Sequence, residues 1–294
     1  MRPEGAARTG RQRGWALISV LWVLSILTML VAAAETLSFG SAQRERRALD
    51  AAQADAALDA GVVRAVLGIA DPRPQMRWRV DGAAQQFELD GQTIRVTIQD
   101  EFGRIDLNAA DGSLLNQLLR SAGVAEQAAD ALTDSILDWR GRSSDLRRLH
   151  GASAADYVKA GLPYQPRHGA FQSVDELRLV LGMSPPLFAR IRPALTVYSH
   201  HPAIDTAIAP REALLAYYPN QPDRVGELMA ARREAGAPGA LGSRPGTLAD
   251  ISNLTGRAFD IVVDLPSNRH AQKPEAVVML TNAAGHPYLV MAWH

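Results

Sequence analysis

Apolar and polar positions alternate in distinct patterns along this chain, and the most regular pattern comes first. Residues 15–34 carry no charge, and twenty residues of helix span roughly 30 Å, the thickness of the hydrocarbon core of a bilayer. From residue 49 to 67 apolar residues recur every three or four positions, as on one face of an amphipathic helix. We therefore expect one helix over residues 15–70, in which Gly40, Gly61 and Gly68 are weak points that cost about 1 kcal/mol each.

Strand patterns occur at both ends of the rest of the chain. Residues 87–89 and 93–98 flank an Asp-Gly turn, which predicts a β-hairpin. Residues 276–280 and 288–293 predict two further strands around a turn. Because two strands alone are only marginally stable, we expect all four to share one sheet.

The middle of the chain has helical spacing. Leucines at 114–119 predict a helix that ends at Gly123, and residues 128–139 and 174–181 predict two more. Helices are also expected at 211–218 and 224–235. The fold class is therefore α+β, with a long N-terminal helix packed on an antiparallel sheet and a large all-helical insertion domain.

A basic segment precedes the apolar run. Four arginines in the first 13 residues oppose the single acid Glu4, so the N-terminus is expected on the cytoplasmic side and the bulk of the chain beyond the membrane. Three fates of this segment remain open. It is a signal peptide cut before Glu35, an uncut signal anchor, or a leader cut between Gly14 and Trp15 that leaves the apolar helix on the mature protein.

Composition narrows the function classes. The 294 residues carry 31 basic and 31 acidic side chains, and there is no cysteine. The chain therefore forms no disulfide, thiolate metal site or cysteine nucleophile. Its seven histidines form no His-Glu-x-x-His motif, and Gly-x-Ser-x-Gly is also missing. We expect neither an enzyme nor a cofactor.

The leader and a series of short motifs resemble a known family. A short basic leader that ends in glycine directly before an apolar helix is similar to the leader of type IV prepilins. Together with the motifs that follow, it resembles the minor pseudopilin K family of type II secretion systems, also called general secretion pathway protein K. The motifs, in order, are Ile105-Asp106-Leu107-Asn108-Ala109-Ala110, Leu132-Thr133-Asp134-Ser135-Ile136-Leu137-Asp138-Trp139, Gly151-Ala152, Tyr157, Pro163-Tyr164, Phe171-Gln172-Ser173-Val174-Asp175-Glu176-Leu177-Arg178, Gly182-Met183 and Leu195-Thr196-Val197-Tyr198.

The resemblance implies a pilin-like subunit that works through protein contacts, without chemistry of its own. It implies a place in the inner membrane, crossed once, and at the tip of the periplasmic pseudopilus, where the subunit serves assembly and protein secretion. The implied partners are the minor pseudopilins I and J, other pseudopilins, prepilin peptidase and, as further candidates, secreted proteins. The implied parts are a leader at 1–14, the membrane half of the spine helix at 15–34, its periplasmic half with the hairpin at 35–100, the helical insertion at 101–199 and an α/β part at 200–294.

The resemblance also assigns residues. Prepilin peptidase would cut after Gly14 and methylate the new N-terminus at Trp15. Ser19 stands at the fifth mature position, where most pilin-like subunits carry a glutamate thought to pair with the N-terminal amine of a neighbour. Because an unpaired charge in the membrane is costly, its absence suggests that there is no such amine to neutralise, as expected at the tip. The residues expected to pack against neighbouring spines are Leu17, Ile18, Leu21 and Trp22.

A different reading of the insertion is a membrane-anchored DNA receptor of the competence type. Such receptors bind phosphate through a Gly-x-Gly turn at a helix N-terminus. The corresponding turns here, at 123–125 and 182–186, lack the second glycine. Residues 101–199 also hold eleven basic and eleven acidic side chains, so they have no basic footprint for DNA. We expect no nucleic acid partner.

Three aspartates raise the question of calcium. Asp130, Asp134 and Asp138 are spaced to line one helix face, which would attract a cation. Relatives usually continue with further acids, but Arg140 and Arg142 follow here, and Ser153 also stands where an acid is common. A solvated face neutralised by these arginines is the alternative that we expect.

Overall fold

The computed structural model describes residues 11–89, 91–141, 148–235, 254–264, 275–283 and 285–293. The chain divides into two compact units, the first ending at Ala56 and the second beginning at Ala57. Helix α1, Arg11–Ile69, contributes to both units. It ends just before Asp71 and Pro72, and a short 3-10 turn, η1 at Pro74–Met76, follows.

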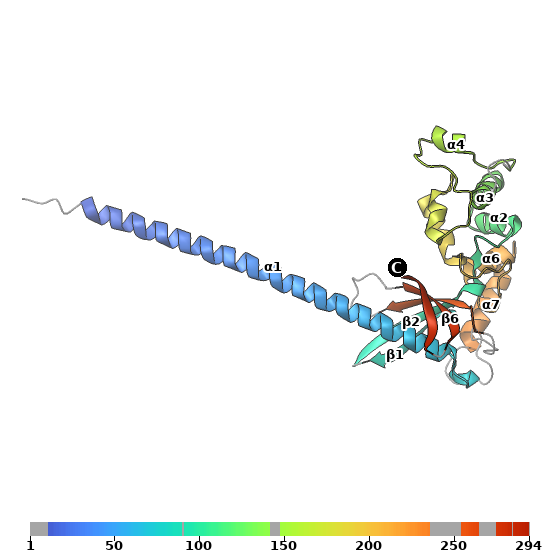
Figure 1. The fold of residues 1–294 in the computed structure, drawn as a ribbon, viewed down its shortest axis with the longest axis horizontal. Coiled ribbons are helices and arrows are strands. Elements are labelled where there is room, and N and C mark those ends of the chain that lie inside the picture. The colour runs from blue at the N-terminus through green and yellow to red at the C-terminus, as the bar shows by residue number, and fades with distance from the viewer. Residues whose placement is uncertain are drawn as a thin grey trace, which may run out of the picture. The chain divides into compact units, whose positions relative to one another are not determined.

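The second unit contains a five-stranded antiparallel sheet with the strand order β1-β2-β5-β6-β7 (Figure 1). The predicted hairpin and both predicted C-terminal strands are present in it. The strand between them, β5, was not predicted from the sequence, and it joins the two pairs because it pairs with β2 on one side and β6 on the other. The strands are β1 at Asp81–Leu89, β2 at Gln92–Asp100, β5 at Ala258–Asp264, β6 at Glu275–Ala283 and β7 at His286–Trp293.

The last turns of α1 pack on this sheet. Buried side chains of α1 from Ala57 to Ile69 join those of β2, β5 and β6 in one hydrophobic cluster, the sheet core. Gly61 and Gly68 allow this close approach, since an added Cβ would lie 2.5 Å from Val263 Cγ2 or 2.4 Å from Trp78 Cγ. The two glycines that weaken the helix in isolation are therefore required by its packing.

The helices between β2 and β5 enclose a second hydrophobic cluster, the helical core. The chain enters through the 3-10 turn η2 (Glu101–Gly103), and β3 (Ile105–Asp106) pairs in parallel with β4 (Leu195–Thr196), so the two ends of the insertion lie side by side. The helical elements are α2 at Gly112–Ser121, α3 at Glu126–Arg140, α4 at Ala154–Lys159, η3 at Val174–Leu179, α5 at Pro185–Ile191, η4 at Arg192–Ala194, α6 at Arg211–Tyr217 and α7 at Pro222–Ala235.

Most of the predicted helices are present, with one error of type. The segment predicted as a helix at 174–181 forms only the short 3-10 helix η3, because Gly182 turns the chain with a φ of +93° and prolines follow it. The helical core also includes Ala213 and Leu214 of α6, so it continues past the predicted boundary at residue 199. The division into five parts stays a prediction, whereas a mixed fold with an antiparallel sheet and several helices is what the structure has.

Candidate functional site

The residues predicted to act at the N-terminus lie on α1 or before it. Leader residues 1–10 lie outside the described residues, as do the side-chain surroundings of residues 11–14, including Gly14. Trp15 is 80% exposed, and Ser19 is exposed on the same helix. The four residues predicted to pack on neighbouring spines are each between 59% and 68% exposed, and their packing stays a prediction; they are Leu17, Ile18, Leu21 and Trp22.

The predicted membrane span at 15–34 is only partly covered by the description. The side chains of residues 16, 33 and 34 are not among those that the structure describes. Among the residues that are described, no helix is long and apolar enough to cross a membrane. The membrane span therefore stays a prediction from the sequence.

The motif at residues 105–110 connects the two ends of the insertion. Asp106 is fully buried, and its Oδ1 accepts hydrogen bonds from the backbone N–H groups of Asn108 (2.7 Å) and Ala109 (3.1 Å). Its Oδ2 accepts from the backbone N–H of His200 (2.8 Å) and from Ser199 Oγ (3.2 Å). One carboxylate thus joins the start of the insertion to the segment that leaves it.

Asn108 makes a second long-range connection. Its Nδ2 donates to the Phe171 carbonyl oxygen at 3.0 Å, and its Oδ1 accepts from the Phe171 backbone N–H at 2.7 Å. The Asn108 side chain thus accepts from and donates to the backbone of one residue, as a neighbouring strand does in a β-sheet. The motif Phe171-Gln172-Ser173 is therefore fixed to the motif that begins the insertion.

Asn108→Ala is expected to destabilise the chain by about 1–3 kcal/mol, because the partners of both bonds at Phe171 lose their hydrogen bonds. The matched control is Asn116→Ala, since Asn116 bonds the exposed Asp130 at 2.8 Å and should cost less than about 0.5 kcal/mol. Urea unfolding followed by circular dichroism measures both. Equal losses in the two variants would contradict the role given to Asn108.

The Asp-Trp motif is also structural. Trp139 is buried, stacks on Phe171 with ring centroids 6.3 Å apart, and lies 6.1 Å from the ring of Tyr157. Its Nε1 donates to Glu176 Oε1 at 2.9 Å, and Glu176 also pairs with Arg167 at 3.1 Å. The partner role of Glu176 was not predicted, since 37 residues separate it from Trp139.

The three aspartates of α3 do not act as a group. Asp130 accepts from Asn116, Asp134 accepts from the His150 backbone N–H at 3.1 Å, and Asp138 pairs with Arg148 at 3.1 Å. No group of three or more acidic or histidine side chains arranged to hold a metal is found in the part of the chain that the structure describes.

The arginine expected to neutralise these aspartates has another role. Arg140 donates to the carbonyl oxygens of Leu107 (2.6 Å) and Ala110 (2.7 Å), so it holds the first motif against α3. That expectation was therefore wrong for Arg140, while Arg142 lies outside the described residues.

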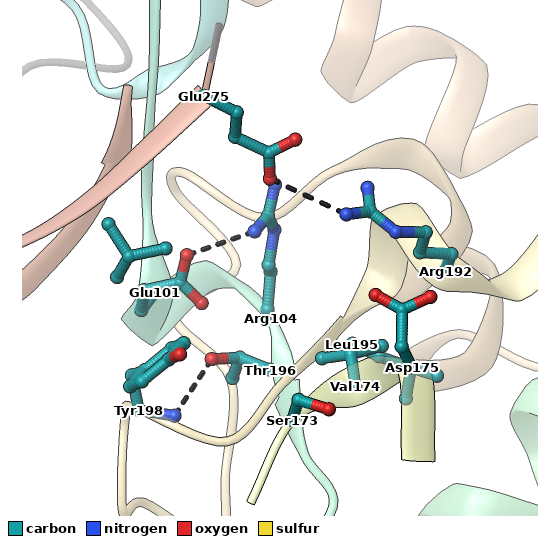
Figure 2. A pocket seen from close by; sticks show the side chains of 11 residues that line it. Glu101, Arg104, Ser173, Val174, Asp175, Arg192, Leu195, Thr196, Tyr198 and Glu275 are labelled. Carbon is teal, nitrogen blue, oxygen red and sulfur yellow. Dashed lines mark hydrogen bonds and ion pairs between the residues drawn. The ribbon is translucent and has the colours of Figure 1, made fainter. Parts of the chain in front are cut away.

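A small cavity of about 40 Å³, partly open to solvent, lies where the sheet core meets the helical core (Figure 2). Arg104 occupies its centre and pairs with Glu101 at 2.9 Å and with Asp260 of β5 at 2.7 Å. At its rim Arg192 pairs with Glu275 of β6 at 3.6 Å. We call these five residues the ionic junction. None of them was singled out from the sequence, because they come from four separate segments of the chain.

The family model that matches this chain and two of its relatives carry the same description. Residues 98–200 match the family model described as "Type II secretion system (T2SS), protein K". The chain is 30% identical over 230 residues to type II secretion system protein K of Klebsiella pneumoniae, covering 70% of each chain. It is 25% identical over 254 residues to the protein of the same name from Pseudomonas aeruginosa, covering 76% of this chain and 74% of that one.

A solved structure has a similar fold. The crystal structure of the GspK–GspI–GspJ complex from the type II secretion system of enterotoxigenic Escherichia coli contains a chain that superposes with a TM-score of 0.56. The two chains are 16% identical, and the match covers 85% of this chain and 98% of the other.

Proposed function

Since the chain belongs to the family of type II secretion system protein K, we propose that this minor pseudopilin stands at the tip of the periplasmic pseudopilus, together with the minor pseudopilins I and J. The observation that carries the proposal is the relationship to the Klebsiella protein over 70% of both chains. The complex in which the structurally similar Escherichia coli chain was solved supports the choice of partners.

We propose a single-pass topology with the bulk of the chain in the periplasm. The arginine-rich leader supports a cytoplasmic N-terminus. The exposed apolar residues of α1 between Trp15 and Val31 support burial in lipid before assembly and against neighbouring helices afterwards. Ser19 in place of a glutamate supports the tip position, because a subunit with nothing above it has no amine to pair.

The work of the subunit is assembly through protein contacts. The family consists of structural subunits of the secretion system, and we propose no catalysis, no cofactor and no nucleic acid partner. Other pseudopilins, prepilin peptidase and secreted proteins complete the proposed set of partners. The motifs of the insertion support this role indirectly, since Asp106, Asn108 and Trp139 build a rigid helical domain that can present a fixed surface.

Co-purification tests the proposal. The full-length chain, produced in membranes with the I and J subunits of the same secretion system, is expected to purify with both in a stable stoichiometric complex. A deletion strain is expected to lose most secretion and to recover it with the wild-type gene. As a control, the major pseudopilin should not replace this chain in the complex. An I–J complex that forms without this chain, in cells that still secrete normally, would contradict the proposal.

A further inference from the structure

The ionic junction contains two carboxylates that share one arginine. Arg104 Nη1 donates to Glu101 Oε1 and Nη2 donates to Asp260 Oδ2. The side chains of Glu101 and Asp260 are only 1% and 5% exposed. Their second oxygens, Glu101 Oε2 and Asp260 Oδ1, are buried and have no hydrogen-bond partner among the described residues. A buried oxygen without a partner costs free energy, so this arrangement needs a further donor.

Among the described residues no cation donates to these two oxygens, and Arg104 Nε is itself buried without a partner. Next to the pair, Asp100 is held by Arg257, which also lies 4.0 Å from Asp205. On the other side Arg192 pairs with Glu275. With the central pair this makes five acids and three arginines among the residues that the structure describes there, and the further titratable groups at the cavity are Asp175 and Tyr198. The excess is negative, so a proton is the missing positive charge.

We propose that Glu101 is protonated near and below neutral pH, and that its Oε2–H group donates a hydrogen bond to Asp260 Oδ1. One proton then satisfies both buried oxygens, while Arg104 keeps its contacts to the other two. Asp260 remains the charged partner of Arg104.

The electrostatics of the site agree with this geometry. Burial raises the pKa of Glu101 from 4.5 to about 7; Arg104 opposes the rise, and Asp260 and Asp100 add to it. The nearby Thr196 hydroxyl opposes the rise more weakly, but it makes no hydrogen bond to Glu101 Oε2, which has no partner among the described residues. Burial likewise raises the pKa of Asp100 from 3.8 to about 6, against the effect of Arg257. Burial acts to lower the pKa of Arg104, but Glu101 and Asp260 raise it overall, so the guanidinium stays charged.

As a consequence, the stability of the ionic junction between the sheet and the helical domain depends on pH. Because the pKa of Glu101 is higher in the folded chain than in the unfolded one, the folded state holds the proton more tightly. The stability that this proton contributes is complete below the unfolded pKa of 4.5 and is lost as the pH rises through about 7. Above that value two buried carboxylates face each other across one arginine, and the junction weakens.

Two isosteric variants of the full-length chain test this inference. Glu101→Gln keeps a neutral side chain with a donor, so its unfolding equilibrium at pH 7 should match the wild type, and the decline in stability between pH 6 and pH 8 should become shallower. Asp260→Asn removes the charge that balances Arg104, so its unfolding constant should rise by at least roughly tenfold. Urea unfolding at several pH values measures both.

An infrared measurement provides a direct readout of the proton. At pH 7 the wild-type chain should show the carbonyl band of a protonated carboxylic acid that shifts in D₂O and loses most of its intensity in Glu101→Gln, while the smaller contribution of Asp100, whose pKa is about 6, remains in both chains. The inference is overturned if Glu101→Gln is destabilised as much as Asp260→Asn or fails to fold, since Glu101 would then act as a charge. It is also overturned if the wild-type stability does not fall from pH 6 to pH 8.

Discussion

Replacing Gly14 with leucine is expected to leave nearly all of the protein as uncleaved precursor and to abolish its assembly. The proposed cut lies between Gly14 and Trp15, where the basic leader meets the apolar run. A glycine at this point lets the backbone enter a narrow protease site that a Cβ and its branch would obstruct. N-terminal sequencing and intact mass of the membrane-extracted protein are the measurements, with wild type expected to begin at methylated Trp15.

Gly10→Leu is the matched control, because it places the same side chain in the same leader four residues before the proposed cut. It should be processed normally. Normal processing of Gly14→Leu would exclude cleavage after this glycine. A mature chain that begins at Glu35 would show that the segment is a signal peptide, and it would remove the spine helix on which the proposed tip assembly depends.

Trp139→Ala is expected to lower the free energy of unfolding by about 3–5 kcal/mol. Trp139 is 3% exposed, and the truncation would open a cavity between Phe171 and Tyr157. It would also leave a carboxylate oxygen of Glu176 without its donor at 2.9 Å. Losses of this size approach the whole stability of many domains, so the helical domain should be largely unfolded at physiological temperature. Thermal unfolding followed by near-ultraviolet circular dichroism measures the effect.

Trp139→Phe separates the contribution of ring packing from that of the hydrogen bond to Glu176. Phenylalanine keeps most of the ring volume but has no N–H for Glu176, so it should cost about 1–2 kcal/mol, the size of one hydrogen bond to a charged group. Trp78→Phe is a useful comparison in the sheet core, where Trp78 packs against Phe87 at 6.2 Å. If Trp139→Ala unfolded at the wild-type temperature, the motif would have a role other than packing.

The candidate site contains two kinds of residue, those that a local pattern identifies and those whose partners are distant in the sequence. The exposed apolar residues Leu21 and Trp22 could be named from the sequence, because a long uncharged run predicts an apolar helix without knowledge of its partners. The partners of Trp139 and Arg140 could not. Glu176 is 37 residues from Trp139, and the carbonyl groups bound by Arg140 are 33 and 30 residues away. A side chain that binds backbone oxygens leaves no pattern in the sequence of its partner.

Elements with a local cause could be predicted from the amino-acid pattern alone. The α+β class, the hairpin at the Asp-Gly turn, the C-terminal strands and helices α2, α3, α6 and α7 all follow from hydrophobic spacing and turn residues that act within a few positions. The order of the insertion motifs indicated the family, to which the comparisons with known proteins assign the chain.

The way in which these elements meet became visible only in the folded chain. It showed that β5 joins the two strand pairs, that Gly61 and Gly68 are needed for close packing, and that Glu101 and Asp260 share Arg104. The physical reason is distance along the chain. Arg104 and Asp260 are 156 residues apart, and such a pair exists only after hydrophobic burial in two separate cores has brought their segments together.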